Sequence, residues 1–308
     1  MNIVEIKKAL ALFEQREKMA RGSIENHEKG WYFGIVGIEI DNDKMYLGDE
    51  NDVYLEKIVM PPMEVEVVRA ISEKYSYNEV SRYTKYIKCQ LFLLNKGFSD
   101  DDYFTAAWWI TTLIKIKLNV DFIVPVVSSH SYDAIAAIKD NTCHIQIIED
   151  FPIILKKIAY TNISNLDEKW IDNHFLTYTK LLEDQGFRLA VNAFTECMYQ
   201  SNSRTSLTLL WAGIESLFEL QNELSFRLSI YIASLIGKNG IEKIDLYRKI
   251  KKMYAIRSKC VHGSKVNESI VINQIVEVKS ILSKILLAII ENGSMFSEEE
   301  LNVKIFGI

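Results

Sequence analysis

Helix-breaking residues are rare in this chain, and their scarcity is the strongest constraint on its fold. Only 13 glycines and 4 prolines occur among 308 residues. Because both residue types destabilise the interior of a helix, so few of them favour long helices. The same counts exclude collagen-like and low-complexity chains. The hydrophobic share of 48% excludes a disordered chain, since enough apolar surface exists to offset the entropy cost of folding.

Strand-like segments occur only before about residue 165. Residues 31–40 are rich in β-branched and aromatic side chains and are bounded by Gly30 and Asn42, which predicts a strand. Further strands are predicted at about 53–60, 121–129 and 143–149, where Pro125 suggests an edge or an interruption. We expect a helix at 2–20 and three helices between 63 and 118.

From about Leu166 onward, apolar residues follow helical spacing and no strand pattern appears. Helices are predicted at 167–182, 185–201, 204–220, 223–236, 241–261 and 268–291. The apolar residues of the last helix, spaced by four and three, are Val271, Ile275, Val278, Leu282, Ile285 and Ile289. We therefore predict an α+β fold, with a mixed α/β region at 1–165, of unknown role, followed by an all-helical bundle at 166–308.

The sequence also limits the compartment and the chemistry. The four cysteines, at positions 89, 143, 197 and 260, form no closely spaced pair of the kind that binds zinc. The amphipathic N-terminus carries acids and does not resemble a signal peptide. The apolar stretch 281–290 is too short to span a bilayer and contains Lys284. We expect a cytoplasmic protein without a membrane segment, a metal or another cofactor.

Charge is unevenly distributed along the chain. The net charge is −5, but residues 238–265 contain nine basic and two acidic residues, a local charge of +7. The remainder is therefore −12. A basic segment on an acidic protein predicts an anionic partner.

The basic segment includes an arginine on an apolar helix face. Arg257 follows Tyr254 by three residues and precedes Val261 by four, so it lies on the stripe that should face the core. A buried charge without a partner is costly. Glu215 and Arg227 lie on the inward stripes of the two preceding helices, and we expect Glu215 to pair with Arg227 or Arg257. The alternative is that these side chains only flank their stripes and reach water.

A serine and a histidine follow Arg257 at the end of the same helix. Gly263 is a plausible helix terminator, and a helix end at His262 would let its ring turn back toward Arg257. Histidine can act as a general acid or base, and arginine binds phosphate and stabilises developing charge. Together they suit metal-free cleavage of RNA, with Ser258, Lys251, Lys252 and Lys259 nearby. The alternative is a structural ion pair and a histidine that caps the helix.

Two aromatic segments before residue 165 also suit nucleic-acid binding. Residues 81–89 interleave tyrosines with lysines and an arginine, a pattern typical of RNA contacts but also of a solvated amphipathic helix. The neighbours Trp108 and Trp109 are either a stacking platform or a pair of core side chains.

Three segments together resemble the Apea-like branch of the HEPN superfamily. They are IESLFEL at 214–220, LSFRLSIYIASLIG at 224–237 and YRKIKKMYAIRSKCVHG at 247–263. The resemblance covers about residues 185–292. The matching positions are Glu215, Arg227, Ala233, Leu235, Gly237, Tyr254, Arg257, Ser258, Val261, His262 and Gly263.

The resemblance implies a helical bundle that forms a homodimer and a metal-independent endoribonuclease site. Arg257 would bind and stabilise the scissile phosphate, and His262 would be the general acid or base. The motifs of two subunits would face each other across a composite cleft. Ser258 stands where active members often have Asn, Asp or His, and Glu215, Arg227 and Tyr254 would support the site.

The resemblance also bears on the role of the whole chain. It implies phage defence or a regulated toxin, with an unidentified trigger acting on residues 1–165. Some relatives have lost catalysis, so the alternative is a non-catalytic bundle that binds RNA or a protein partner.

Overall fold

The computed structural model describes residues 3–25, 27–71, 77–150, 158–218, 220 and 222–306. It has an α+β fold with a helical C-terminal region. The chain forms two compact units: residues 1–111 with 120–172, and residues 112–119 with 173–308. In the part of the chain that is described, no helix has the length and apolarity needed to cross a membrane.

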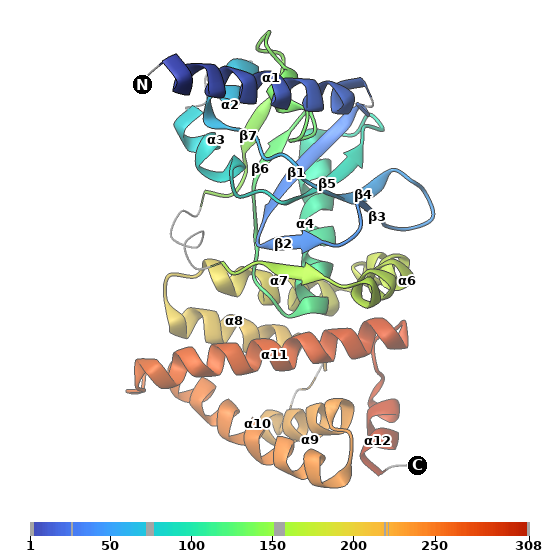
Figure 1. Cartoon of the computed structure of the whole chain (residues 1–308). Helices are drawn as coiled ribbons and strands as arrows, with labels where there is room; N and C mark the ends of the chain where they lie inside the picture. The colour runs from blue at the N-terminus through green and yellow to red at the C-terminus, as the bar shows by residue number, and fades with distance from the viewer. Residues whose placement is uncertain are drawn as a thin grey trace. The chain divides into compact units, whose positions relative to one another are not determined.

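A six-stranded antiparallel sheet forms the centre of the first unit (Figure 1). Its strand order is β3-β4-β5-β1-β6-β7, and the two short strands β2 and β8 pair separately in parallel. The strands are β1 (Gly30–Val36), β2 (Ile38–Ile40), β3 (Lys44–Tyr46), β4 (Val53–Lys57), β5 (Cys89–Leu94), β6 (Ile123–Ser128), β7 (Ile145–Ile147) and β8 (Thr161–Ile163). The unit's described α-helices are α1 (Ile3–Glu25), α2 (Glu64–Ala70), α3 (Tyr77–Thr84), the first part of α4 (Asp100–Leu118) and the start of α6 (Asn165–Leu181).

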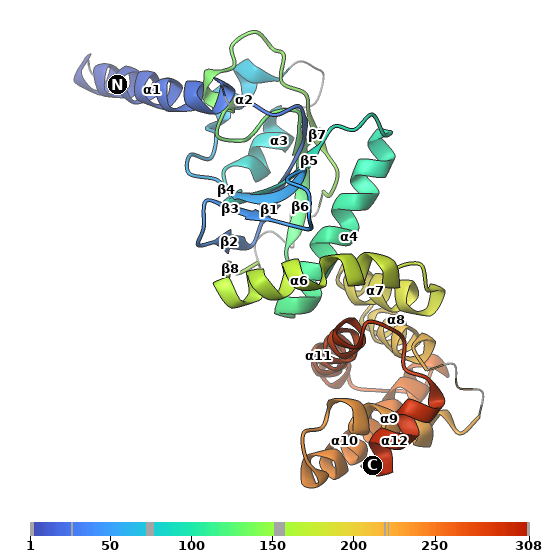
Figure 2. The same cartoon turned by 90° about the vertical axis from the view of Figure 1, so that its right-hand side faces the viewer.

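Helices cover both faces of this sheet, with α4 on one side and α3 on the other (Figure 2). The alternation of side chains along β1 produces this arrangement. The Phe33 ring contacts Phe104 of α4, with centroids 5.9 Å apart. A Cβ at the next residue, Gly34, would lie 2.4 Å from the Ile87 side chain just after α3. The close approach on that face requires glycine.

The strand predicted at 31–40 is present but is broken at Gly37. That residue has φ of +110°, a backbone conformation that side chains rarely adopt. The chain leaves the main sheet there and continues as β2. The strand predicted at 121–129 is β6, which lies between β1 and β7 rather than at an edge. Its register against β1 shifts between Gly34 and Val36, opposite the segment that contains Pro125, so the predicted interruption is confirmed.

The prediction of three helices between 63 and 118 is incomplete, because β5 lies among them. This strand, CQLFLL, is buried near the middle of the sheet. A short apolar run fits a buried strand and a buried helix equally well. The helix expected at 81–89 ends at Thr84. Tyr83 is fully buried and donates a hydrogen bond to Asp150 at 2.6 Å, so it cannot stack on a base.

A polar cluster that includes Glu56 of β4 and Gln90 of β5 lies on one face of the sheet. The Gln90 amide, fully buried, donates to Glu56 at 2.5 Å and to Ser131 at 2.8 Å. Burial raises the pKa of the Glu56 carboxyl above its ordinary 4.5, although Gln90 and Lys44 oppose the shift. The nearby Asp133 charge adds to it.

We expect the Glu56→Gln variant to gain stability relative to wild type as the pH rises. The folded state holds the Glu56 proton more tightly than the unfolded state. Its stabilising contribution is therefore complete below pH 4.5 and is lost as the pH rises through the raised pKa. Urea unfolding of both proteins at about pH 4 and pH 7 measures the difference. A difference in stability between the two proteins that does not change with pH would contradict the prediction.

The second unit is helical, as predicted (Figure 1). Its elements are the end of α6 (Asn165–Leu181), α7 (Gln185–Glu196), α8 (Ser203–Ser216), α9 (Leu224–Ile236), α10 (Gly240–Val261), α11 (Glu268–Asn292) and α12 (Glu298–Phe306). Side-chain caps explain where several of them begin: Asp184, Asn202, Asn239 and Asn267 each accept a backbone N–H of the first turn. The α12 helix was not predicted.

The apolar stripe predicted for α11 is confirmed. Val271, Val278, Leu282, Ile285 and Ile289 are buried, and Ile275 is half-buried. The last part of α4 packs in the same unit, where Ser283 donates to the Ile116 carbonyl at 2.7 Å. The Thr195 and Thr112 hydroxyls are 3.1 Å apart.

Candidate functional site

Glu215, Tyr254 and Arg257 form a connected polar network between α8 and α10. The Arg257 Nη2 donates to Glu215 Oε2 at 3.0 Å, and the Tyr254 hydroxyl donates to Glu215 Oε1 at 3.0 Å. Each carboxylate oxygen therefore has its own donor. We expected Glu215 to pair with Arg227 or Arg257, and its partner in the structure is Arg257.

Burial and aromatic contacts hold this network in place. The Arg257 and Glu215 side chains are 20% and 22% exposed, so the pair is shielded but not closed off from solvent. The guanidinium carbon lies 5.4 Å from the centre of the Tyr254 ring, a distance that allows a cation–π contact. In the described structure, the buried Nε of Arg257 has no hydrogen-bond partner. Arg257 is thus fixed through one nitrogen and keeps donors that Glu215 does not use.

Trp211 supports Tyr254 from α8. The two rings meet edge to face, with centroids 5.1 Å apart. Burial and the Glu215 charge raise the pKa of Tyr254 to about 12, against the opposing effect of Arg257. Tyr254 therefore keeps its proton at neutral pH and remains a donor to Glu215. The sequence prediction missed Trp211, although it lies one helical turn before Glu215.

Arg227, which we expected near this network, has a different partner. It pairs with Glu298 at the start of α12 and donates to the Tyr231 hydroxyl at 3.0 Å. Arg227 was predicted to support the Glu215 site, but among the described residues no hydrogen bond or ion pair joins Arg227 to Glu215. The physical reason is that α12 supplies a nearer carboxylate, and α12 has no strong sequence signal.

The helix face on which Arg257 lies between Tyr254 and Val261 was expected to point toward the core, and only its middle part is buried. Ile250, Met253 and Tyr254 are buried, but Ile244 and Val261 are 52% and 45% exposed. Cys260 is buried in place of Val261. Because the helix repeats every 3.6 residues, its buried face after Arg257 continues at a spacing of three rather than four.

His262 lies immediately after the last residue of α10. Its backbone N–H donates to the Ser258 carbonyl at 3.1 Å, and the Ser264 N–H donates to the Lys259 carbonyl at 2.9 Å. Gly263, with φ of +70°, makes this ending possible and is the predicted terminator. The His262 side chain is exposed. Among the residues described, it forms no hydrogen bond with Arg257, so the expected turn of the ring toward Arg257 is not seen.

Three exposed lysines contribute positive charge to the outer side of α10. Arg248 and Lys249 have acidic neighbours, Asp245 at 3.7 Å and Glu277 at 3.1 Å. Lys251, Lys252 and Lys259 are exposed and form no ion pair with any described residue. Residues seven apart lie on one side of a helix, so Lys252 and Lys259 face the same way.

Within the described ranges, no three His, Cys, Asp or Glu side chains are grouped so that they could hold a metal ion. All four cysteines are buried and free. Comparison of the chain with protein-family models, with curated proteins and with solved structures gives no match. What the chain does must therefore be inferred from its own residues and their geometry.

Proposed function

We propose that the chain is a metal-independent endoribonuclease of the HEPN type, with its site at the C-terminal end of α10. The supporting observation is the way Glu215 holds Arg257, whose side chain is 20% exposed, five residues before the exposed His262. A positioned arginine can bind a phosphate through its remaining donors. An exposed imidazole can reach a substrate proton.

The proposed reaction is an internal transfer at the RNA phosphate. The ribose 2′-oxygen loses its proton and bonds to the adjacent phosphorus, and the bond from phosphorus to the 5′-oxygen breaks. The leaving oxygen takes up a proton. The products are a 2′,3′-cyclic phosphate and a 5′-hydroxyl. Arg257 stabilises the negative charge that grows on the phosphoryl oxygens, and His262 moves one of the two protons.

A second copy of the chain would complete this site. One imidazole cannot take a proton from the 2′-oxygen and give one to the 5′-oxygen in a single concerted step, so we propose a homodimer in which two motifs face each other. Exposed apolar side chains on α10 and α11 suit such an interface: Ile244, Val261, Ile272 and Val276 are each at least 45% exposed. Lys251, Lys252 and Lys259 would bind the RNA backbone.

The biological setting that fits this activity is phage defence or a regulated toxin. Uncontrolled RNA cleavage harms the cell that makes the enzyme, so activity must be restrained. In this proposal residues 1–165 respond to the trigger.

A second candidate is a non-catalytic module that binds RNA or a protein partner. The observation that favours it is that Glu215 already neutralises Arg257, while His262 contributes its backbone to the helix end. This candidate keeps the basic surface of α10 but predicts no cleavage.

End analysis of RNA cleaved in the presence of EDTA distinguishes the two candidates. Purified wild type and the double variant Arg257→Ala/His262→Ala are incubated with end-labelled RNA. The nuclease predicts cleavage by wild type that leaves 2′,3′-cyclic phosphates and is lost in the double variant. Arg248→Ala, which removes an exposed arginine from the same helix, is the matched control and should cleave normally. RNA binding without cleavage by wild type would support the binding module instead.

A further inference from the structure

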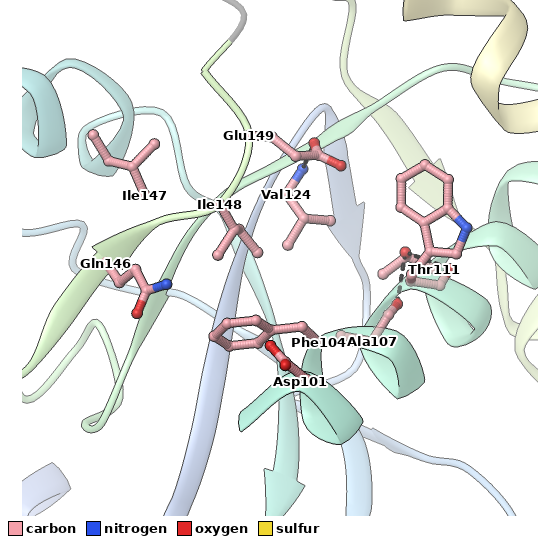
Figure 3. A pocket seen from close by; sticks show the side chains of 10 residues that line it. Asp101, Phe104, Ala107, Thr111, Val124, Gln146, Ile147, Ile148 and Glu149 are labelled. Atoms are coloured by element: carbon pink, nitrogen blue, oxygen red, sulfur yellow. Dashed lines mark hydrogen bonds between the residues drawn. The ribbon is translucent and has the colours of Figure 1, made fainter. Parts of the chain in front are cut away.

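The first unit contains a cavity of about 470 Å³ between α4 and the β6–β7 edge of the sheet (Figure 3). This volume lies within the range of about 300–1,000 Å³ typical of small-molecule sites. The cavity is separate in sequence and in its lining from the Arg257 network. The described residues that line it include Asp101, Phe104, Trp108, Thr111, Gln146 and Glu149.

One face of α4 forms the helical wall. Asp101, Phe104, Trp108 and Thr111 follow spacings of three and four, so they lie along a single side of the helix. Phe104 is anchored against Phe33 of β1. Trp108 lines this cavity and is half-buried rather than a core side chain, which corrects the prediction of a core tryptophan pair. Two aromatic rings one turn apart thus border the same space.

The polar side chains of the cavity differ in whether they already form hydrogen bonds within the protein. The Glu149 carboxylate accepts the Val124 N–H at 2.8 Å, and the Thr111 hydroxyl donates to the Ala107 carbonyl at 2.7 Å. Asp101 and Gln146, on opposite walls in Figure 3, have no side-chain hydrogen bond to any residue that the structure describes. They are the groups free to recognise a ligand.

The residues that line the cavity indicate which class of ligand it could bind. Among the described residues that line the cavity there is no lysine or arginine, so none of them would hold a phosphate or another anion. The aromatic rings favour a flat ligand. A purely apolar ligand that covered the half-buried Gln146 would leave its amide without a hydrogen bond, which is unfavourable, and would not use the exposed Asp101 carboxylate. The ligand that satisfies both conditions is a planar heterocycle with hydrogen-bond donors on its edge.

We propose that this cavity binds the base of a nucleoside that carries an exocyclic amino group. The Gln146 amide can donate and accept at adjacent atoms of such a base, and the Asp101 carboxylate can accept from the amino group. Adenine, guanine and cytosine carry that group, and uracil does not. A nucleoside fits better than a nucleotide, because no described lining residue is a cation that could hold a phosphate.

Calorimetric titration of the full chain with adenosine, guanosine, cytidine and uridine tests this proposal. At least one of the first three should bind saturably, and uridine at least tenfold more weakly. Trp108→Leu and Gln146→Leu should each weaken binding about tenfold, given the typical value of a stacking or edge contact. Trp109→Leu, a change at the neighbouring residue outside the lining, is the matched control and should bind as wild type does.

Two results would overturn the proposal: no binding of any nucleoside at millimolar concentration by the folded chain, or binding that Trp108→Leu and Gln146→Leu leave unchanged. Equal affinity for uridine would also overturn it, because recognition would then not involve an amino group. Binding is measured without RNA cleavage, so failure here is independent of whether Arg257 and His262 form a nuclease site.

Discussion

The Arg257→Ala variant is expected to cleave RNA about 100- to 1,000-fold more slowly than wild type, the typical effect of removing one group that stabilises charge in a transition state. Arg257→Lys should not restore the rate. A lysine ammonium lacks the planar fork that can contact Glu215 and a phosphate together. Single-turnover cleavage rates in EDTA, measured with saturating enzyme, report the effect on the chemical step.

A stability measurement separates this role from a purely structural one. Arg257→Ala leaves the Glu215 carboxylate without its cation, which should lower the free energy of unfolding by about 1–2 kcal/mol. This is below the loss for a fully buried pair, because both side chains are about a fifth exposed. His262→Ala should slow cleavage comparably with no loss of stability, since His262 is exposed. Full activity in either variant, when folded, would contradict the nuclease proposal.

The Gly213→Leu variant is expected to destabilise the second unit by about 3 kcal/mol, at the upper end of typical overpacking effects. Gly213 lies where α7 and α8 cross. A Cβ at this position would be 2.6 Å from the Ala193 Cβ and 3.2 Å from the Ala190 Cα. A larger side chain must push the two helices apart, because the nearest atoms belong to small residues and backbone that cannot move aside.

Thermal unfolding measures this effect, and a second glycine provides the control. A loss of about 3 kcal/mol should lower the midpoint by roughly 6 to 12 °C for a unit of this size. Gly240, the first residue of α10, has nothing within 4 Å of an added Cβ. Gly240→Leu should therefore unfold close to wild type. Equal midpoints for Gly213→Leu and wild type would show that α7 and α8 are not tightly packed there.

The sequence alone determined most of the second unit. Helix positions from residue 165 to 292, the stripe on α11 and the termination at Gly263 were all predictable. They depend on contacts between residues three or four apart and on caps within one turn, so the information is local. The pairing of Glu215 with Arg257 was one of two predicted options, because both arginines lie on inward stripes.

Tertiary structure decided the features that depend on distant residues. The strand β5 is recognisable only from its neighbours β4 and β1, since CQLFLL has no periodicity that excludes a helix. Arg227 pairs with Glu298, which lies 71 residues away on a helix with little sequence signal. The cavity beside Trp108 likewise exists only because the sheet places Gln146 opposite α4. Local spacing determines which face of an element is apolar, whereas packing between elements decides which side chains meet across it.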